Sequence, residues 1–183
     1  MTRCRPVFDP FGIGAAALDT IRPCIYDKFD PAALSTAIHE MRLRVERELG
    51  HPRGKIEIKR GTGGVMDIDF MTHYLQLAHG HARAQLRTPS TREALQVAGA
   101  LGLLGPEVVQ DLQFAYEFLR RVENCLRLFD LKNVSAMTLS DEALDPLCRA
   151  FGFSDDHAGF LDQFTRITTT VRGCFDELLT GVA

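Results

Sequence analysis

The apolar residues between positions 106 and 129 recur mostly at intervals of three and four. This period places them on one face of an α-helix, so the segment predicts a long amphipathic helix packed against a core. Pro106 stands at a favoured first helical position. A chain with such a helix needs other apolar faces to cover it. The predicted face consists of Val109, Leu112, Ala115, Tyr116, Leu119, Val122, Leu126 and Phe129.

Six further segments show helical periodicity, and capping residues mark several of their ends. They cover residues 15–28, 31–49, 65–79, 91–102, 144–150 and 156–179. The expected N-caps of four of them are Asp30, Ser90, Ser140 and Ser154. In the helix over 31–49, the stripe expected to face the core consists of Leu34, Ile38, Met41, Val45 and Leu49.

A basic flank accompanies the apolar seam at the end of the long helix. It consists of Arg120, Arg121 and Arg127. Helical spacing allows Glu117 to pair with Arg120 or Arg121, and Glu123 to pair with Arg127. This flank is either a solvated, salt-bridged face or an arginine face for an acidic or phosphorylated partner.

Residues 55–59 form the only convincing strand pattern, because Ile56 and Ile58 alternate with charged residues. One strand does not make a sheet, so it needs a partner outside the chain or a second short segment that the pattern does not reveal. The sequence therefore predicts an all-α helical bundle of six or seven helices, with at most one short strand or hairpin near residues 55–60. The unpaired strand suggests a piece of a larger protein.

Composition narrows the class of protein. The 183 residues have a formal net charge of −3, which argues against a nucleic-acid partner. No apolar run approaches the roughly 20 residues that span a bilayer, so no membrane partner is expected. The five cysteines are scattered without CxxC pairs, as in reduced cytoplasmic proteins.

The stretch "KIEIKRGTGGVMDIDF" holds the candidate binding residues. Gly61, Gly63 and Gly64 permit close approach of the backbone to a ligand, and a helix starts directly after them. Free N–H groups at that helix start, with Lys59 and Arg60 nearby, would form an anion site. The pattern matches neither a P-loop nor GxGxxG, and a flexible turn between strand and helix is the alternative.

Asp67 and Asp69 resemble a metal-binding DxD pair. On a strand they would share a face, but on a helix they lie roughly 200° apart and cannot hold one ion together. We therefore expect them to stabilise the helix start through its dipole. His73, His79 and His81 lack a shared helical face, so no metal site is predicted. The spacing of the Ser, His and Asp residues does not indicate a catalytic triad either, so no catalytic residue is predicted in this chain.

Three segments together resemble the helical domain of the glutamine synthetase adenylyltransferase family (glutamate–ammonia-ligase adenylyltransferase). They are "IKRGTGGVMDIDFMTHYLQLAHG", "LGLLGPEVVQDLQFAYEFLRRVENCLRL" and "LCRAFGF". The family pattern K-x-G-x-G-G-x-x-[DE]-I-[DE]-F falls on Lys59, Gly61, Gly63, Gly64, Asp67, Ile68, Asp69 and Phe70. The uridylyltransferase of the PII signal protein carries a related domain and is an alternative.

The resemblance implies a nitrogen-control enzyme that adds AMP to a tyrosine of glutamine synthetase or removes it, using ATP and Mg²⁺. Its catalytic carboxylates belong to a preceding nucleotidyltransferase domain with a GSDxD signature, and this chain contains no GSDxD. The implied partners are glutamine synthetase, the PII protein and that nucleotidyltransferase domain. Lys59, Arg60, Gly61, Gly63, Gly64, Asp67 and Asp69 are the expected nucleotide-facing residues.

We therefore expect one helical domain, itself inactive, from a longer enzyme. Residues 1–14 form an irregular lead-in, 15–50 two leading helices, 55–64 the strand and glycine-rich loop, and 65–180 the main bundle. The ending "FDELLTGVA" favours the adenylylating half, which we prefer, although "FLRRVEN" is more similar to the deadenylylating half. A non-enzymatic helical module that docks a PII-type regulator is the competing interpretation.

Overall fold

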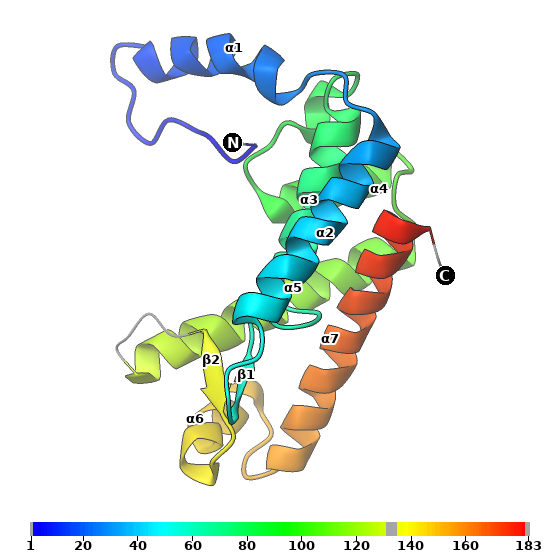
Figure 1. The fold of residues 1–183 in the computed structure, drawn as a ribbon. Coiled ribbons are helices and arrows are strands. Elements are labelled where there is room, and N and C mark those ends of the chain that lie inside the picture. Colours follow the sequence, from blue (N-terminus) through cyan, green and yellow to red (C-terminus); the bar gives the residue numbers. More distant parts are fainter. Residues whose placement is uncertain (1, 131–134, 182–183) are drawn as a thin grey trace.

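The computed structural model describes residues 2–130 and 135–181. Within them the chain forms seven α-helices, one short 3-10 helix and two short strands, which confirms the predicted helical bundle (Figure 1). The elements are α1 (Ile13–Ile25), α2 (Pro31–Leu49), β1 (Lys55–Glu57), α3 (Val65–His79), η1 (Ala84–Leu86), α4 (Thr91–Ala100), α5 (Pro106–Asp130), β2 (Ala136–Thr138), α6 (Asp141–Phe151) and α7 (His157–Thr180). No helix in the described ranges is both long and apolar enough to cross a membrane.

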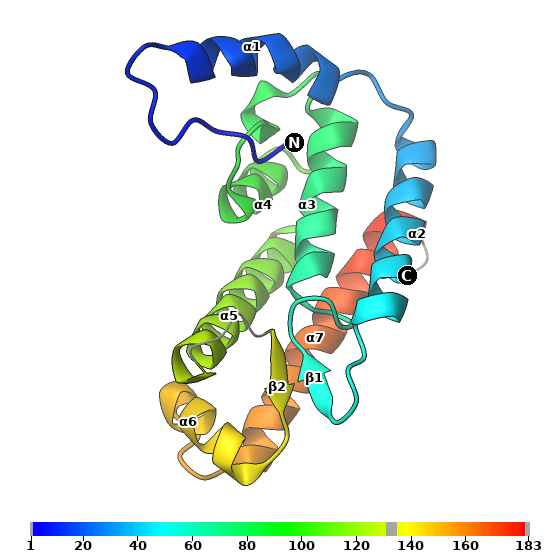
Figure 2. The same cartoon turned by 60° about the vertical axis from the view of Figure 1, so that its left-hand side comes forward.

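Helix α3 lies at the centre of the bundle and contacts α2, α4, α5 and α7. Figures 1 and 2 both show α2 alongside α3, with α1 set across one end, and in Figure 2 α7 passes behind the lower part of α2. Buried residues occur on several sides of α3, as its mostly apolar sequence predicts. Because α3 is packed on several sides, the position of the loop that leads into it is also determined by the bundle.

Most of the α5 face predicted from periodicity lies in the core, but Phe129 at its end is 48% exposed, so its placement on that face was wrong. Leu119 and Val122 are fully buried, and Leu126 is nearly so. Phenylalanines from α5, α6 and α7 meet beside this face, with the ring centroids of Phe118 and Phe151 at 5.0 Å. Packing of this kind stabilises the bundle through the area that it removes from water.

The strand has a partner inside the chain, so the second of the two alternatives, an unrecognised short segment, is confirmed, and the strand gives no sign of a missing partner outside the chain. β1 pairs antiparallel with β2, with Ile56 opposite Met137 (Figure 2). β1 is also shorter than predicted, since it ends at Glu57. The partner was not recognised because three residues are too few to show alternation.

Helix α2 does not bury the stripe expected of it. Met41 and Leu49 are 58% and 50% exposed, whereas Arg42 is fully buried. The helix turns this polar side chain inward because it meets charged groups of α3 and α7, described below. The predicted N-cap is correct, since the Asp30 carboxylate accepts a hydrogen bond from the Ala33 amide.

Three helix starts differ from the sequence prediction, and at two of them an aspartate that was not predicted as a cap accepts from backbone amides. α6 begins at Asp141, three residues before the predicted start. α1 begins at Ile13, inside the predicted lead-in, where the Asp9 carboxylate accepts hydrogen bonds from the amides of Gly14 and Ala15. α7 is capped by Asp156, which accepts from the Gly159 amide at 2.9 Å, and not by Ser154. In both cases an aspartate supplies the acceptor that the free helical amides need.

The basic flank of α5 is organised around a buried carboxylate. Glu123 is fully buried and accepts hydrogen bonds from Arg120 and Arg127, each at 2.6 Å, which confirms its pairing with Arg127. Glu117 instead pairs with Arg92 of α4 at 3.1 Å, so the predicted pairing with Arg120 or Arg121 was wrong. This part of α5 therefore has ion pairs to the buried Glu123 within the helix and one surface ion pair to α4.

Candidate functional site

The glycine-rich loop, residues 59–64, connects β1 to the start of α3 and lies directly against α7. Gly63 has φ +67°, a left-handed conformation that favours glycine. A β-carbon there would lie 1.8 Å from the carbonyl oxygen of Thr168 in α7, and one at Gly64 would lie 2.5 Å from the carbonyl oxygen of Ile58. These two glycines therefore permit close packing within the protein.

Apart from that of Thr62, the backbone amides of the loop and the helix start already have acceptors in the chain. The Gly63 amide donates to Oδ2 of Asp67 at 2.8 Å, and the amides of Lys59 and Arg60 donate to Oε1 of Glu57. The remaining donations run from Gly61 to Glu57, Gly64 to Gly61, Val65 to Ile58, Met66 to Lys59 and Asp67 to Gly64, each to a carbonyl oxygen. The expectation that these N–H groups are free was wrong.

The two cationic side chains of the loop, Arg60 and Lys59, differ in whether they have polar partners within the protein. Arg60 donates to Oε2 of the buried Glu57 at 3.1 Å and to the Ser135 hydroxyl at 3.2 Å. The half-buried Lys59 side chain forms no hydrogen bond or ion pair with any described residue. Lys59 is thus the loop cation that remains available to a ligand.

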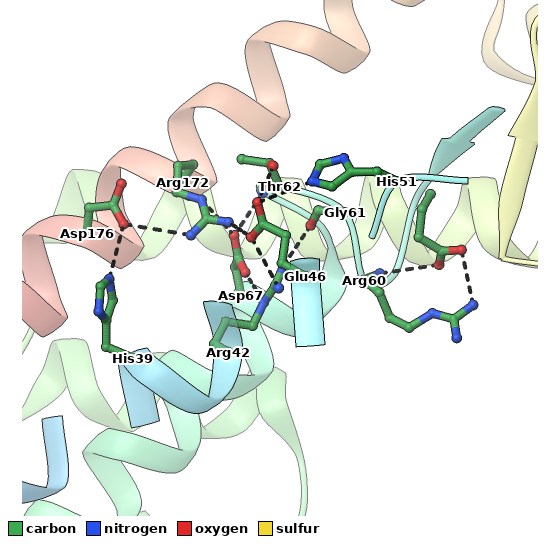
Figure 3. A network of polar contacts seen from close by, with 12 residues as sticks. His39, Arg42, Glu46, His51, Arg60, Gly61, Thr62, Asp67, Arg172 and Asp176 are labelled. Atoms are coloured by element: carbon green, nitrogen blue, oxygen red, sulfur yellow. Dashed lines mark hydrogen bonds and ion pairs between the residues drawn. The ribbon is translucent and has the colours of Figure 1, made fainter. Parts of the chain in front are cut away.

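A charged network holds the loop between α2, α3 and α7. We call Arg42, Glu46, Asp67 and Arg172 the arginine network (Figure 3). Arg42 forms ion pairs with Asp67 and, at 3.2 Å, with Glu46. Arg172 forms ion pairs with Glu46 and, at 3.4 Å, with Asp67. Two positive and two negative groups therefore compensate one another in the interior, as buried charges must.

Three members of this network also contact the loop directly. The Arg42 guanidinium donates to the carbonyl oxygen of Gly61 at 2.7 Å, and Glu46 accepts from the Thr62 hydroxyl at 2.5 Å. Figure 3 shows both contacts beside Asp67, which accepts the Gly63 amide. Three consecutive loop residues are thus fixed by three network side chains.

The two carboxylates of the network respond differently to their surroundings. Burial raises the pKa of Asp67 above its usual value, although Arg42 and Arg172 oppose this shift. Burial also acts on Glu46, but the Thr62 hydroxyl and the two guanidiniums outweigh it and hold the pKa of Glu46 below its usual value. Depth of burial accounts for the contrast, since Asp67 has no exposed surface.

Asp67 and Asp69 point to different partners. Asp67 belongs to the first turn of α3, but its contacts are with arginines rather than with the helix dipole alone. Asp69 lies beyond that turn and pairs with Arg3, while it also accepts from the Thr91 hydroxyl. Among the described residues, no three or more metal-binding side chains come together.

Sequence reasoning missed Arg42, Glu46 and Arg172, which organise the loop. One indication was present, because Arg42 lies four residues after Ile38 and three before Val45, on the same helical face. A charged residue among inward-facing positions indicates a buried counter-charge. The sequence offers no comparable indication for Arg172.

Comparison with known proteins places most of the chain in one family. The family model described as GlnD PII-uridylyltransferase matches residues 35–179. A protein of Streptomyces avermitilis is 30% identical over 97% of this chain, and one of Xanthomonas campestris pv. campestris is 31% identical over 97%. A third, from Corynebacterium efficiens, is 33% identical over 84%. All three are named "Bifunctional glutamine synthetase adenylyltransferase/adenylyl-removing enzyme".

The bundle and its relatives define a helical domain that is similar to part of much longer nucleotidyltransferases. The chain belongs to the GlnD PII-uridylyltransferase family, and its similarity to the adenylyltransferases confirms the resemblance seen in its motifs. It spans 18%, 19% and 15% of the three relatives, less than a fifth of each.

Proposed function

We propose that this chain is the helical lobe of a longer nucleotidyltransferase that regulates glutamine synthetase. The complete enzyme would transfer AMP from ATP to a tyrosine of glutamine synthetase, or remove it, under control of a PII-type protein. The names of the relatives support glutamine synthetase as the target. A separate nucleotidyltransferase domain would perform the chemistry, so the lobe alone would transfer nothing.

The proposal for the site rests on the lack of a polar partner for the Lys59 side chain. Its side chain has no polar partner among the described residues, although the loop around it is held by the arginine network. A positive charge on a fixed backbone is a good partner for phosphate oxygens, since little ordering remains to be done on binding. We assign Lys59 the role of contacting the phosphates of ATP at the domain boundary.

The residues present fit ATP and Mg²⁺ unequally. Lys59 suits a phosphate group, whereas the amides of Gly61, Gly63 and Gly64 are already engaged. Mg²⁺ needs oxygen ligands in an open octahedral site, and Asp67 is enclosed by two guanidiniums. The donor set of this chain therefore does not fit Mg²⁺, and Asp67 and Asp69 are proposed to position the loop and the helix.

The test replaces Lys59 in the complete enzyme and measures AMP incorporation into glutamine synthetase as ATP is varied. Lys59→Ala should lower transfer at limiting ATP about tenfold or more, because a charge-assisted contact contributes roughly 1.5–3 kcal/mol. Lys55→Ala is the matched control, since Lys55 is an exposed lysine four residues away in β1. Both variants should unfold at the same denaturant concentration as the unaltered enzyme.

Two results would overturn the proposal. Unchanged ATP kinetics in Lys59→Ala, together with an Asp67→Asn enzyme that is folded but inactive, would make the loop a simple turn and Asp67 the chemical residue. AMP transfer by the isolated 183-residue chain would contradict the proposal that a separate domain performs the chemistry. Binding of a PII protein by a chain whose full-length parent transfers no AMP would favour the docking module instead.

A further inference from the structure

A small cavity lies at the opposite end of α3 from the glycine-rich loop. Its walls are the N-terminal arm (residues 2–6), α1 and the segment that follows α3. It encloses about 170 Å³, and three of its lining residues are arginines: Arg5, Arg22 and Arg87. None of the described residues that line it is acidic. The cavity therefore gathers positive charge from three separate segments.

Arg87 is held in a fixed position. Its Nε donates to the carbonyl oxygen of Gly80 at 2.8 Å, and its Nη2 donates to that of His81 at 3.0 Å. Its guanidinium carbon also lies 5.2 Å from the centroid of the buried Tyr26 ring, a cation–π contact. The side chain is thus ordered before any ligand arrives.

Tyr26 is itself locked in place by the end of α3. A β-carbon at Gly80 would lie 2.6 Å from Cδ1 of the Tyr26 ring, so the ring packs against bare backbone. Burial raises the pKa of Tyr26, while the nearby charges of Arg87 and Arg22 oppose the shift. Both guanidiniums therefore act on the same small region.

The other two arginines differ in whether their charge is compensated. Arg22 pairs with Asp19 of the same helix at 2.6 Å. Arg5 forms no hydrogen bond or ion pair within the described ranges. The arm that carries Arg5 is anchored, because the neighbouring Arg3 pairs with Asp69 and donates to Thr91. Within the described ranges, the three guanidiniums that line the cavity therefore pair with a single carboxylate, that of Asp19, which is not itself a lining residue.

We propose that this cavity binds the phosphate group of a small molecule. Guanidinium groups prefer oxyanions, to which they donate paired hydrogen bonds. A dianionic tetrahedral group offers oxygens to arginines from three directions and neutralises more charge than one carboxylate. Pockets for drug-sized ligands measure roughly 300–1,000 Å³, so this smaller cavity suits a phosphate with little attached to it. The site is distinct from the glycine-rich loop and does not depend on the function proposed for it.

The experiment titrates the 183-residue chain with inorganic phosphate by calorimetry, at constant ionic strength maintained with chloride. Saturable binding is expected, and Arg5→Gln and Arg87→Gln should each weaken it about tenfold or more. Arg5→Gln is decisive, because Arg5 has no internal contacts whose loss would disturb folding. Arg44→Gln, an exposed arginine of α2, should bind as the unaltered chain does.

A second readout locates the ligand. Cys4 lines this cavity, whereas Cys24 lines a neighbouring apolar groove, and both are exposed. Phosphate should slow alkylation of Cys4 and leave Cys24 unchanged, as measured for each cysteine by mass spectrometry. Absence of saturable binding, equal affinity in Arg5→Gln, or tighter binding of succinate than of phosphate would overturn the proposal.

Discussion

The Arg42 guanidinium donates a hydrogen bond of 2.7 Å to the carbonyl oxygen of Gly61, so a side chain of α2 fixes the glycine-rich loop. The same guanidinium forms ion pairs with Asp67 and Glu46. The conformation of the loop therefore depends on a buried, charged side chain that contacts it.

Arg42→Met should destabilise the protein strongly. Removing one partner of a buried ion pair leaves an uncompensated charge and costs about 3–5 kcal/mol. Urea unfolding measures the loss, and Arg44→Met is the control on the exposed side of the same helix. Combining Arg42→Met with Asp67→Asn should recover part of the loss. A cost under about 1 kcal/mol would mean that Arg42 is not the charge partner of Asp67.

Gly63→Ala should prevent the loop from packing on α7. The new β-carbon would meet the Thr168 carbonyl oxygen at 1.8 Å, and the backbone has φ +67°. Strain and overpacking together should cost at least about 2 kcal/mol in denaturant unfolding. Gly173→Ala in α7 is the control, because its β-carbon meets nothing within 4 Å and alanine favours a helix. Equal stabilities for the two variants would argue against the close approach.

Leu119→Ala should cost about 2–5 kcal/mol, because Leu119 is fully buried in the α5 seam. Leu128→Ala lies on the same helix, but Leu128 is 71% exposed and its loss should cost under about 0.5 kcal/mol. Thermal and denaturant unfolding measure both. Similar losses for the two leucines would mean that α5 is rotated from its described position.

His157 should make stability depend on pH. Its ring nitrogens lie 3.2 Å from Asp141 and 2.7 Å from Asp145, and Arg149 also pairs with Asp145. The hydrogen bond to Asp145, aided by Asp141, raises the pKa of His157 above its usual 6.5. The folded protein therefore binds the proton more tightly, so the stabilisation is complete below pH 6.5 and disappears as pH rises through the raised pKa.

Melting temperatures of the unaltered chain and of His157→Gln, measured between pH 5.5 and 8.5, test this effect. The difference between the two should be largest at the acidic end and shrink as pH rises. His73 and His79, whose pKa values burial lowers, contribute with the opposite sign but cancel in the difference. A difference that is constant with pH would contradict a charged His157 bridge.

Local patterns predicted the helices well, while contacts between distant residues escaped them. The α5 face and the Asp30 cap depend on neighbours within a turn or two, where periodicity and capping act. Pairing of β1 with β2 depends on the fold of everything between them. The loop residues were identified, but their anchors were not, because Glu46 and Arg172 lie 126 positions apart. No pattern within a few residues of either position indicates that the two side chains form an ion pair.

The position of Arg172 far downstream of the other members of the arginine network has a consequence for biosynthesis. As the protein leaves the ribosome, Glu46 and Asp67 emerge soon after Arg42, but α7 emerges after α4, α5 and α6. Until then these two carboxylates have one guanidinium between them, and Gly63 has no α7 backbone to rest on. The glycine-rich loop therefore acquires its final shape only after α7 has been synthesised, so nascent chains that end before α7 would expose an unfinished loop.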